Sequence, residues 1–337
     1  MQSNIAVSIP VSGTDPSKEK HLNMIEFDLP SDRSWRVFHI PKKTPGEYRK
    51  ITAPNPTLKA VQQELLRALQ ADERLKPSAF AHGFVQHCST ITGVRRHGRR
   101  ADILKIDVKD FFDTFPVKAV EDRLLEVGYT QEQVEKILEL CIYNNTIPQG
   151  GPCSPFLTNV GMFHTDLQIG AYAKEHKLTY SRYADDLCFG FMEDLPHEEA
   201  VRAKKRHVKA VSKLLYKNLR LVINKKKIQF VRTNSPRASR RVTGIVIRND
   251  GKGYNAPRRM RETVRAMTFN LAKKVEAAGG RMTDEDRSKM MTIIGYVRYM
   301  DGIRVHGGGT EDATTADPRI QEKEWNYLRA IWKQSTQ

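Results

Sequence analysis

Tyr183-Ala184-Asp185-Asp186 lies between two apolar or aromatic runs, Leu178-Thr179-Tyr180 before it and Leu187-Cys188-Phe189 after it. Period-two patterning on both sides predicts two strands, so we expect the acid pair at the tip of a hairpin. Adjacent like charges repel and resist desolvation, and a bound divalent cation removes both penalties. A solvated turn is the alternative, because Asp favours turns for local reasons.

A third acid closes another predicted strand. Ile103-Leu104-Lys105-Ile106-Asp107-Val108 is short and mostly apolar, and Lys109-Asp110-Phe111-Phe112-Asp113-Thr114-Phe115 follows it. An acid at the end of a buried strand, together with an acid pair on a hairpin, can hold two metal ions for an in-line displacement at phosphorus. The alternative for Asp107 is a helix N-cap beside the strand end.

Charge and length agree with an enzyme that acts on a polyanion. The chain has 337 residues, enough for two or three subdomains, and its 56 Lys and Arg outnumber 39 Asp and Glu, giving a formal net charge of +17. Such a surplus predicts attraction to nucleic acid. An anionic membrane surface and a basic protein without a dedicated partner are the alternatives, but no long basic amphipathic helix with an aromatic face stands out.

Cysteine usage and hydropathy indicate the compartment. Cys88, Cys141, Cys153 and Cys188 are far apart and form no CxxC pair, which predicts neither a zinc site nor a disulfide framework. The sequence begins polar, without a hydrophobic signal region, and no apolar run is long enough to span a bilayer. We therefore expect a cytoplasmic, reduced protein with no membrane partner.

Periodicity predicts the remaining elements. The polar residues 1–25 predict an extension or a loosely attached first helix, and residues 35–51 predict a hairpin with exposed cations. Helices are expected at Thr57–Leu75 (capped by Thr57), Val117–Val127, Thr130–Tyr143 (capped by Thr130), Phe156–Tyr172 and Glu198–Leu219, and throughout the chain from Ala256. Further strands are expected at Leu221–Ile223 and Arg241–Ile247, the latter ending in the turn Asn249-Asp250-Gly251.

A Gly- and Pro-rich loop precedes one of these helices. Ile147-Pro148-Gln149-Gly150-Gly151-Pro152-Cys153-Ser154-Pro155 leads into the helix from Phe156. Free N–H groups and the helix dipole at that position favour a phosphate, and Gln149 adds a donor and acceptor suited to a nucleotide. A plain turn is the alternative.

Three of these motifs occur in the order and rough separation seen in reverse transcriptases. They are Ile106–Phe112, Pro148–Pro155 and Tyr183–Asp186, with supporting matches at Tyr48–Ile51, His82–Phe84 and Leu221–Lys227. The chain resembles the bacterial branch shared with group II intron enzymes, and Arg241-Val242-Thr243-Gly244 resembles the Val-Thr-Gly triplet of retron reverse transcriptases. Those enzymes usually carry an Asn-Ala-x-x-His element, of which Gly93-Val94-Arg95-Arg96-His97 retains only the His.

The resemblance implies an α+β fold, a right-hand polymerase with fingers, a palm of antiparallel sheet and helices, and a helical thumb. It implies an N-terminal extension at 1–30, fingers at 31–100 with part of 117–160, a palm at 101–254, and an RNA-binding thumb at 255–337. A composition shift near residue 254 supports the last boundary.

The resemblance also assigns the catalytic residues. Asp107, Asp185 and Asp186, with the carbonyl of Val108, would bind two Mg²⁺ ions. Lys227 best matches the lysine that protonates the pyrophosphate leaving group, although three lysines in a row leave its register open and a plain basic face is the alternative.

A second implied group binds the dNTP. Arg49 and Lys50 would meet its triphosphate, since cationic side chains match phosphate oxygens. Phe112 resembles the steric gate against a ribose 2′-OH, although it and its neighbour could instead be core aromatics. The implied dNTP-binding residues are Arg49, Lys50, Asp110, Phe111, Phe112 and Gln149.

For a retron enzyme, the resemblance implies that it copies part of its own noncoding RNA (msr-msd) from a guanosine 2′-OH into branched msDNA, in anti-phage defence with a separate effector protein. The implied RNA contacts are Val242, Thr243, Gly244, Arg258, Arg259 and Arg261. Two alternatives remain: a stand-alone intron-like or diversity-generating reverse transcriptase that extends a 3′-OH primer, and a catalytically silent RNA-binding regulator.

Overall fold

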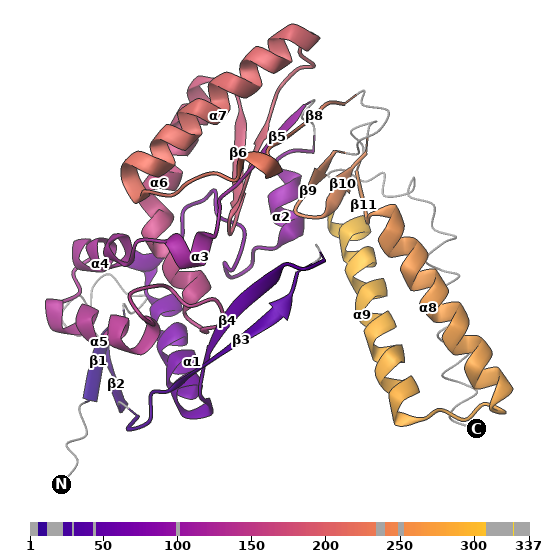
Figure 1. Cartoon of the computed structure of the whole chain (residues 1–337), viewed down its shortest axis with the longest axis horizontal. Coiled ribbons are helices and arrows are strands. Elements are labelled where there is room, and N and C mark those ends of the chain that lie inside the picture. Colours follow the sequence, from indigo (N-terminus) through magenta and orange to yellow (C-terminus); the bar gives the residue numbers. More distant parts are fainter. Residues whose placement is uncertain are drawn as a thin grey trace. The chain divides into compact units, whose positions relative to one another are not determined.

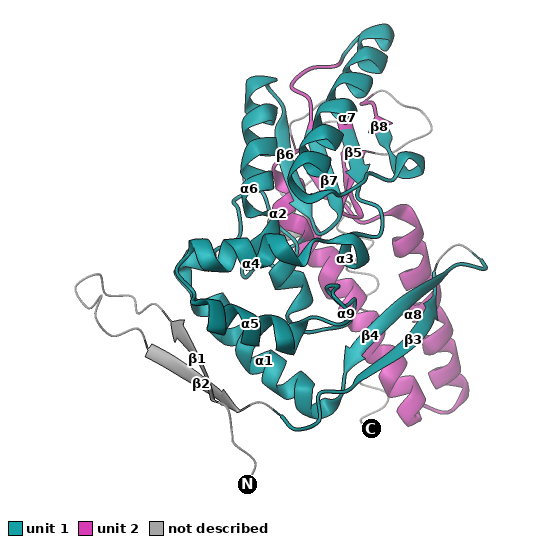
Figure 2. Cartoon of the chain, turned by 60° about the vertical axis from the view of Figure 1, so that its left-hand side comes forward, with its two compact units in different colours: residues 1–89, 104–189, 195–229 teal, residues 90–103, 190–194, 230–337 magenta. Residues whose placement is uncertain are grey.

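The computed structural model describes residues 6–11, 23–28, 30–42, 45–98, 102–233, 240–248, 253–307 and 326. Contacts divide the chain into two units, coloured separately in Figure 2. Unit 1 comprises residues 1–89, 104–189 and 195–229, and unit 2 comprises residues 90–103, 190–194 and 230–337. Each unit is therefore assembled from segments that are distant in sequence.

Unit 1 begins with two hairpins. The strands of the first, β1 (Ala6–Val11) and β2 (Asn23–Asp28), pair antiparallel, as do β3 (Trp35–Pro41) and β4 (Tyr48–Pro54) of the second. Helix α1 (Pro56–Ala71) follows β4, and a short 3₁₀ turn, η2 (Glu73–Leu75), follows α1. Helices α3 (Phe111–Thr114), α4 (Val117–Glu126) and α5 (Gln131–Cys141) come later in the chain (Figure 1).

A four-stranded sheet carries the acids that the sequence singled out. Its order is β6 (Thr179–Tyr183), β7 (Asp186–Gly190), β5 (Ile103–Asp107) and β8 (Gln229–Val231). The central strands are buried on both faces, as consecutive apolar residues predict. Helix α6 (Ser154–Glu175) lies against β6, and α7 (His197–Leu219) lies along α6 (Figure 1). A 3₁₀ turn, η3 (Lys225–Lys227), precedes β8.

The described part of unit 2 comprises a small sheet and three helices. The sheet order is β11 (Tyr254–Asn255), β10 (Ile245–Ile247) and β9 (Arg241–Val242), all antiparallel. Helix α2 (Thr90–Arg95) lies against β9, β10 and α9. Helices α8 (Arg258–Ala277) and α9 (Asp284–Gly307) pack on each other through buried residues such as Val264, Leu271 and Val297.

Most of the predicted elements are confirmed. The hairpin with exposed cations is β3–β4, the acid pair lies at the β6–β7 turn, and Asp107 ends β5. Thr130 caps α5 as predicted, and Gln133 completes a reciprocal capping box. Helix α6 is longer than predicted at both ends. The part of the chain described after Pro257 is helical, apart from the α8–α9 connection.

Four local predictions are wrong. Residues 6–11 and 23–28 are strands, so the helix offered as one of the two alternatives for the N-terminal region is wrong. Asn55 caps α1 in place of Thr57, because its side chain accepts a hydrogen bond from Leu58 N. Leu221–Ile223 is not a strand and forms only a bridge between Ile223 and Val108. Residues 241–247 form a hairpin that turns at Thr243 and Gly244; the predicted turn at 249–251 lies outside the described residues.

Among the described residues, no helix is long and apolar enough to cross a membrane.

Candidate active site

The tight turn between β6 and β7 presents the acid pair. β6 ends at Tyr183, Ala184 and Asp185 form the turn, and Asp186 begins β7. Ala184 has φ 53°, in the left-handed region that costs an L-residue about 1–2 kcal/mol. Both acids are half-buried. The hairpin predicted from alternating residues is therefore present, and its turn is strained.

The third acid lies on the neighbouring strand. β5 pairs with β7 in the sheet, and the N–H of Val108 donates a hydrogen bond to the carbonyl of Asp185 (3.0 Å). Asp107 ends β5 and is 8% exposed, and its carbonyl accepts a hydrogen bond from Asn224 N (2.7 Å). The structure thus brings together three acids separated by almost eighty residues. Asp107 is not a helix cap, since α3 begins only after Asp110.

The three carboxylates share one electrostatic environment. Burial, followed by the charges of Asp186 and Asp107, raises the pKa of Asp185 to about 6. Burial also raises the pKa of Asp186, which Asp107 raises further and nearby lysines lower. Because the negative charges of these acids repel one another, a bound cation would stabilise all three carboxylates.

Lys227 pairs with the first of these acids. Its Nζ lies 2.9 Å from Asp107 Oδ2, and that hydrogen bond raises the pKa of Lys227. The hydrogen bond joins residues 120 positions apart in the sequence. Of the three consecutive lysines in η3, Lys227 is the one for which this contact with Asp107 is found.

The acids suit a divalent cation in their chemistry. Asp107 Oδ1 is buried and has no hydrogen-bond partner among the described residues, so it is available as an oxygen ligand. Within the described part of the chain, however, no three Asp, Glu, His or Cys side chains are gathered closely enough to form a ready metal site. Asp107, Asp185 and Asp186 could hold the ion after small side-chain adjustments, with Lys227 released from Asp107.

The predicted nucleotide-binding residues lie on three segments of unit 1. Arg49 and Lys50 are exposed on β4. Asp110 is exposed and precedes α3 with φ 45°. Phe111 is buried and packs edge-on against Phe115 at 5.3 Å, while Phe112 is half-buried. Of the two rings, Phe112 is therefore the one that a ligand can reach.

The loop that carries Gln149 lies against β4. The carbonyl of Gln149 accepts a hydrogen bond from Thr52 N (3.0 Å). Gly150 has φ 140°, and a Cβ there would lie 2.8 Å from the Thr52 carbonyl oxygen, so only glycine fits. The structure therefore places Gln149 beside the strand that carries Arg49 and Lys50.

The predicted RNA-binding residues all belong to unit 2. Thr243 and Gly244 have φ values of 47° and 86°, as in a tight hairpin turn, and Thr243 Oγ1 donates to the carbonyl of Thr90 (3.2 Å). Val242 is buried. Arg258 and Arg259 are exposed at the start of α8, Arg258 pairs with Glu262, and Arg261 is half-buried.

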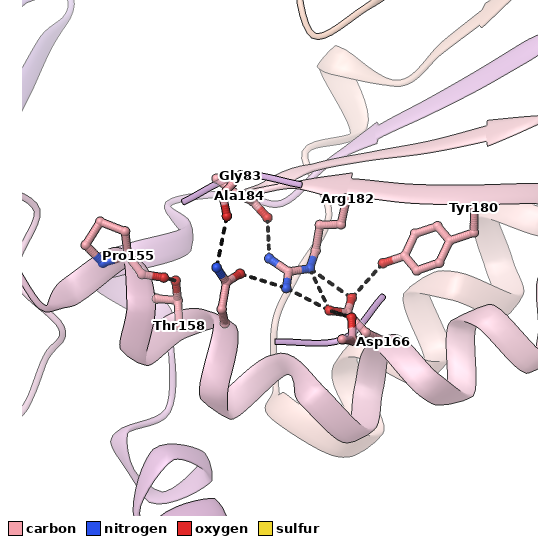
Figure 3. Close-up of polar contacts among 9 residues, drawn as sticks. Gly83, Pro155, Thr158, Asp166, Tyr180, Arg182 and Ala184 are labelled. Carbon is pink, nitrogen blue, oxygen red and sulfur yellow. Dashed lines mark hydrogen bonds and ion pairs between the residues drawn. The ribbon is translucent and has the colours of Figure 1, made fainter. Parts of the chain in front are cut away.

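Sequence reasoning missed a buried ion pair behind the acid hairpin. Arg182 and Asp166 are both fully buried and form a salt bridge at 2.7 Å (Figure 3). The alternation of β6 carried a signal, because Arg182 faces the same side as Tyr180, and a charged residue on an inward face needs a partner.

Comparison with known proteins gives the family. Residues 40–247 match the family described as "Reverse transcriptase (RNA-dependent DNA polymerase)". Retron Ec86 reverse transcriptase of Escherichia coli is 31% identical over 279 residues, which cover 80% of this chain and 82% of that protein. Retron Ec83 reverse transcriptase, also of Escherichia coli, is 27% identical over 78% of this chain and 81% of that protein. A solved structure of apo telomerase from Candida tropicalis has a TM-score of 0.47 and 12% identity over 97% of this chain and 70% of its own.

The family match and the retron relatives each span most of the described polymerase motifs. Mixed helices and antiparallel sheets form the α+β architecture of a right-hand polymerase. Membership brings an RNA template and, in general, a divalent metal. The chain therefore belongs to the reverse transcriptases of the bacterial retron type and is an RNA-directed DNA polymerase.

Proposed function

We propose that this enzyme copies part of its own noncoding RNA, the msr-msd transcript, into branched msDNA, starting from the 2′-OH of a guanosine in that RNA. The observation that carries the proposal is the 31% identity to a retron reverse transcriptase over 82% of that relative's length. Anti-phage defence with a separate effector protein is part of the same proposal, which rests on the retron resemblance.

The chemistry is assigned to the three acids. Asp107, Asp185 and Asp186, with the carbonyl of Val108, would hold two Mg²⁺ ions, which activate an attacking hydroxyl and stabilise the leaving oxygen. Two observations support this role. The hydrogen bond between Val108 N and the Asp185 carbonyl keeps the strands in register, and one buried Asp107 oxygen has no hydrogen-bond partner in the described part of the chain.

Lys227 acts in this scheme as a proton donor. Its raised pKa keeps Nζ protonated at neutral pH, and it lies beside Asp107. From there Nζ could donate a proton to the pyrophosphate oxygen as the bond to phosphorus breaks. The ion pair with Asp107 would have to open first, because one ammonium cannot serve both partners fully.

Binding of the dNTP is assigned to the exposed side chains around the Gln149 loop. Arg49 and Lys50 would contact the triphosphate, and the main chain of Asp110 would join them. Phe112 would exclude a ribose 2′-OH, with Phe111 supporting its ring from the core. Gln149 would pack near the sugar. The hydrogen bond between Thr52 and Gln149, which joins β4 to the loop, supports this grouping.

RNA recognition is assigned to unit 2. The Val242-Thr243-Gly244 turn and the arginines at the start of α8 would contact the structured part of the noncoding RNA. The exposure of Gly244, Arg258 and Arg259 supports this role. The boundaries of fingers, palm and thumb remain a prediction.

Analysis of the copurifying nucleic acid tests the proposal. The purified protein should carry DNA that stays joined to RNA after protein removal and that a 2′–5′ debranching enzyme releases. DNA primed from an ordinary 3′-OH would indicate the other class of reverse transcriptase. Absence of any primer extension with Mg²⁺ and dNTPs would indicate a silent RNA-binding regulator.

The site assignment has its own test. Asp185→Ala should abolish primer extension while RNA binding, measured by fluorescence anisotropy, stays within about twofold of wild type, because the acid opposes rather than attracts phosphates. Persisting synthesis would rule out the assignment. A plaque assay with the same variant would then link polymerisation to defence.

A further inference from the structure

The strained turn that carries the acid pair is held by a buried arginine. Arg182 lies two residues before Ala184, and its Nη1 donates a hydrogen bond to the Ala184 carbonyl (3.2 Å, Figure 3). Its Nε and Nη2 bind Asp166 of α6 at 2.8 and 2.7 Å, in a bidentate pair. Both side chains are fully buried. The guanidinium therefore ties the turn directly to the helix behind it.

The partners of Asp166 make this pair rigid. Tyr180 Oη and Ser78 Oγ each donate to its carboxylate at 2.8 Å, so both oxygens are shared between the arginine and a hydroxyl. A buried ion pair stays in place only when its remaining hydrogen-bonding capacity is satisfied, as it is here. Apolar residues of similar volume often stabilise a core about as well, so the net contribution of this ion pair to stability is expected to be small.

A second chain of hydrogen bonds runs from Arg182 through Asn159 toward the turn. Its Oδ1 accepts from Arg182 Nη2 (2.9 Å), and its Nδ2 donates to the carbonyl of Gly83 (2.9 Å). Gly83 lies close to the turn, since a Cβ added at this glycine would lie 2.8 Å from Ala184 N. The turn is therefore held at the Ala184 carbonyl by Arg182 and at the Asp185 carbonyl by Val108, and Gly83 leaves no room for a side chain beside Ala184 N.

We infer that Arg182, Asp166 and Asn159 are positioning residues for the metal-binding acids. They fix the left-handed Ala184 turn, and through it the backbone of Asp185 and Asp186, before metal and dNTP arrive. None of the three contacts the reacting groups. The inference rests on the proposed metal-binding role of Asp185 and Asp186.

The test separates positioning from folding. In the double variant Arg182→Met/Asp166→Leu both charges are removed together, so no unpaired charge stays buried and thermal stability should remain near wild type. We expect kcat to fall about 10–100-fold and the Kd for Mn²⁺, titrated alone and followed by electron paramagnetic resonance, to rise by a similar factor. KM for dNTP should change less than about twofold, because Arg182 does not touch the nucleotide.

Gly83→Ala provides a second route to the same turn. It leaves the ion pair intact and presses on Ala184 N, so it should reproduce the loss of kcat and of Mn²⁺ affinity in a folded protein. Arg182→Lys should be more active than the double variant and less active than wild type, because lysine keeps the positive charge but cannot make the two parallel hydrogen bonds of the guanidinium. Wild-type kcat and Mn²⁺ affinity in a folded double variant, or in Gly83→Ala, would overturn the inference. Activity persisting in Asp185→Ala would instead overturn the proposed function.

A separate observation concerns α7. Residues 200–249 contain 16 Lys and Arg and no Asp or Glu. On α7 and its cap, most of the exposed cations form one stripe opposite the buried face that contains Ala203, His207 and Val211. The stripe consists of Arg202, Arg206, Lys209, Lys213, Lys217 and Arg220. It spans about 27 Å at the rise of an α-helix.

Like charges at this spacing destabilise a helix by about 0.2–0.5 kcal/mol per pair. Among the described residues, the one ion pair of the stripe joins Arg202 to Glu198. Tyr216 is 53% exposed and lies under the Arg220 guanidinium, which adds an aromatic surface beside the cations. We infer that this stripe binds the phosphate backbone of structured RNA, outside the residues assigned to catalysis. The inference deepens the proposed function, because its partner is the template molecule.

Charge reversal on the stripe tests this inference. Lys209→Glu/Lys213→Glu should weaken binding of a labelled RNA duplex and lower the slope of log K against log salt by about 2, one for each phosphate that the variant no longer neutralises. Lys59→Glu/Arg67→Glu on α1 changes the charge equally and is the matched control. Primer extension on a short template should stay at the wild-type rate, which separates this result from failure of the active site.

Equal losses of RNA affinity in both double variants would overturn the inference. If Lys209→Glu/Lys213→Glu weakened binding of duplex DNA as much as binding of duplex RNA, the stripe would bind nucleic acid of either kind, and its assignment to RNA would be overturned.

Discussion

Unit 1 contains two buried acids that each bind an arginine and a tyrosine, and the two sites differ in what the arginine reaches. Asp72 accepts from Arg74 at 2.6 Å and from Tyr129 at 2.8 Å, at the corner where α1 ends. Arg74 continues to the carbonyl of Val127, at the end of α4, and its side chain is 30% exposed.

The corresponding arginine behind the acid hairpin is completely buried and reaches the Ala184 carbonyl. The same chemistry therefore closes a helix corner in one region and holds a strained turn that carries two acids in the other. The surroundings of the arginine, more than the acid it binds, decide which role the pair has.

Removing the acid of the Arg182–Asp166 ion pair should have the largest effect on stability. Asp166→Leu leaves the Arg182 charge buried and unpaired, which costs about 3–5 kcal/mol. Urea unfolding followed by circular dichroism would measure it. The double variant with Arg182→Met is the control, and a single variant as stable as the double one would show that water already reaches this arginine.

Removing the charge of Asp72 from the Arg74–Asp72 ion pair should reduce stability less and should leave catalysis unchanged. Asp72→Asn should lower the free energy of unfolding by about 1–3 kcal/mol, because Arg74 is partly exposed and its charge can be hydrated. The kcat for primer extension should stay at the wild-type value. A loss of kcat as large as that of the Arg182 variants would erase the contrast between the two sites.

The two regions should also differ in their pH dependence. The pKa of Asp185, raised to about 6 by burial and neighbouring acids, means that the native state binds a proton more tightly than the unfolded state. The stability of the metal-free protein should therefore fall as pH rises from about 4 to 6, by at most about 1.4 kcal/mol per pH unit from this group. Burial alone would raise the pKa of Asp72, but hydrogen bonds from Arg74 and Tyr129 outweigh it, and the pKa is lowered. The contribution of Asp72 to stability is therefore lost only as pH falls below the ordinary range of Asp.

Chemical unfolding of the wild type and of Asp185→Asn between pH 4 and 7 would measure this difference. The asparagine variant should show a smaller decline above pH 4, the remainder coming from Asp186, whose pKa burial also raises. An unchanged profile would mean that Asp185 titrates normally and that the acids do not share an environment.

Removing one hydroxyl at each site should have the smallest effect. Tyr180→Phe and Tyr129→Phe each delete a hydrogen bond to a buried carboxylate, worth about 1.5–3 kcal/mol for a charged acceptor and less where other donors remain. Both acids keep their arginine, so we expect values near the lower end. Only Tyr180→Phe should also reduce kcat, by a few fold, since Asp166 positions Arg182.

Local patterns in the sequence predicted the elements of the active site well. Alternation around Tyr183–Asp186 predicted β6 and β7, the apolar run before Asp107 predicted β5, and Thr130 was correctly identified as a cap. Each of these depends on residues within a few positions of one another. The errors arose where several local signals compete, as at Thr57, or where a turn needs a left-handed backbone, as at Thr243.

The amino-acid sequence by itself determined the family, the order of the motifs and which acids are the candidates for metal binding. Only the tertiary structure decided which of three lysines pairs with Asp107 and that Arg182 is buried between Asp166 and the Ala184 turn. The physical reason is that the pairs Arg182–Asp166 and Lys227–Asp107 join residues 16 and 120 positions apart, where sequence spacing carries no geometric information. Burial, which sets the strength of these contacts, comes from packing of the whole unit.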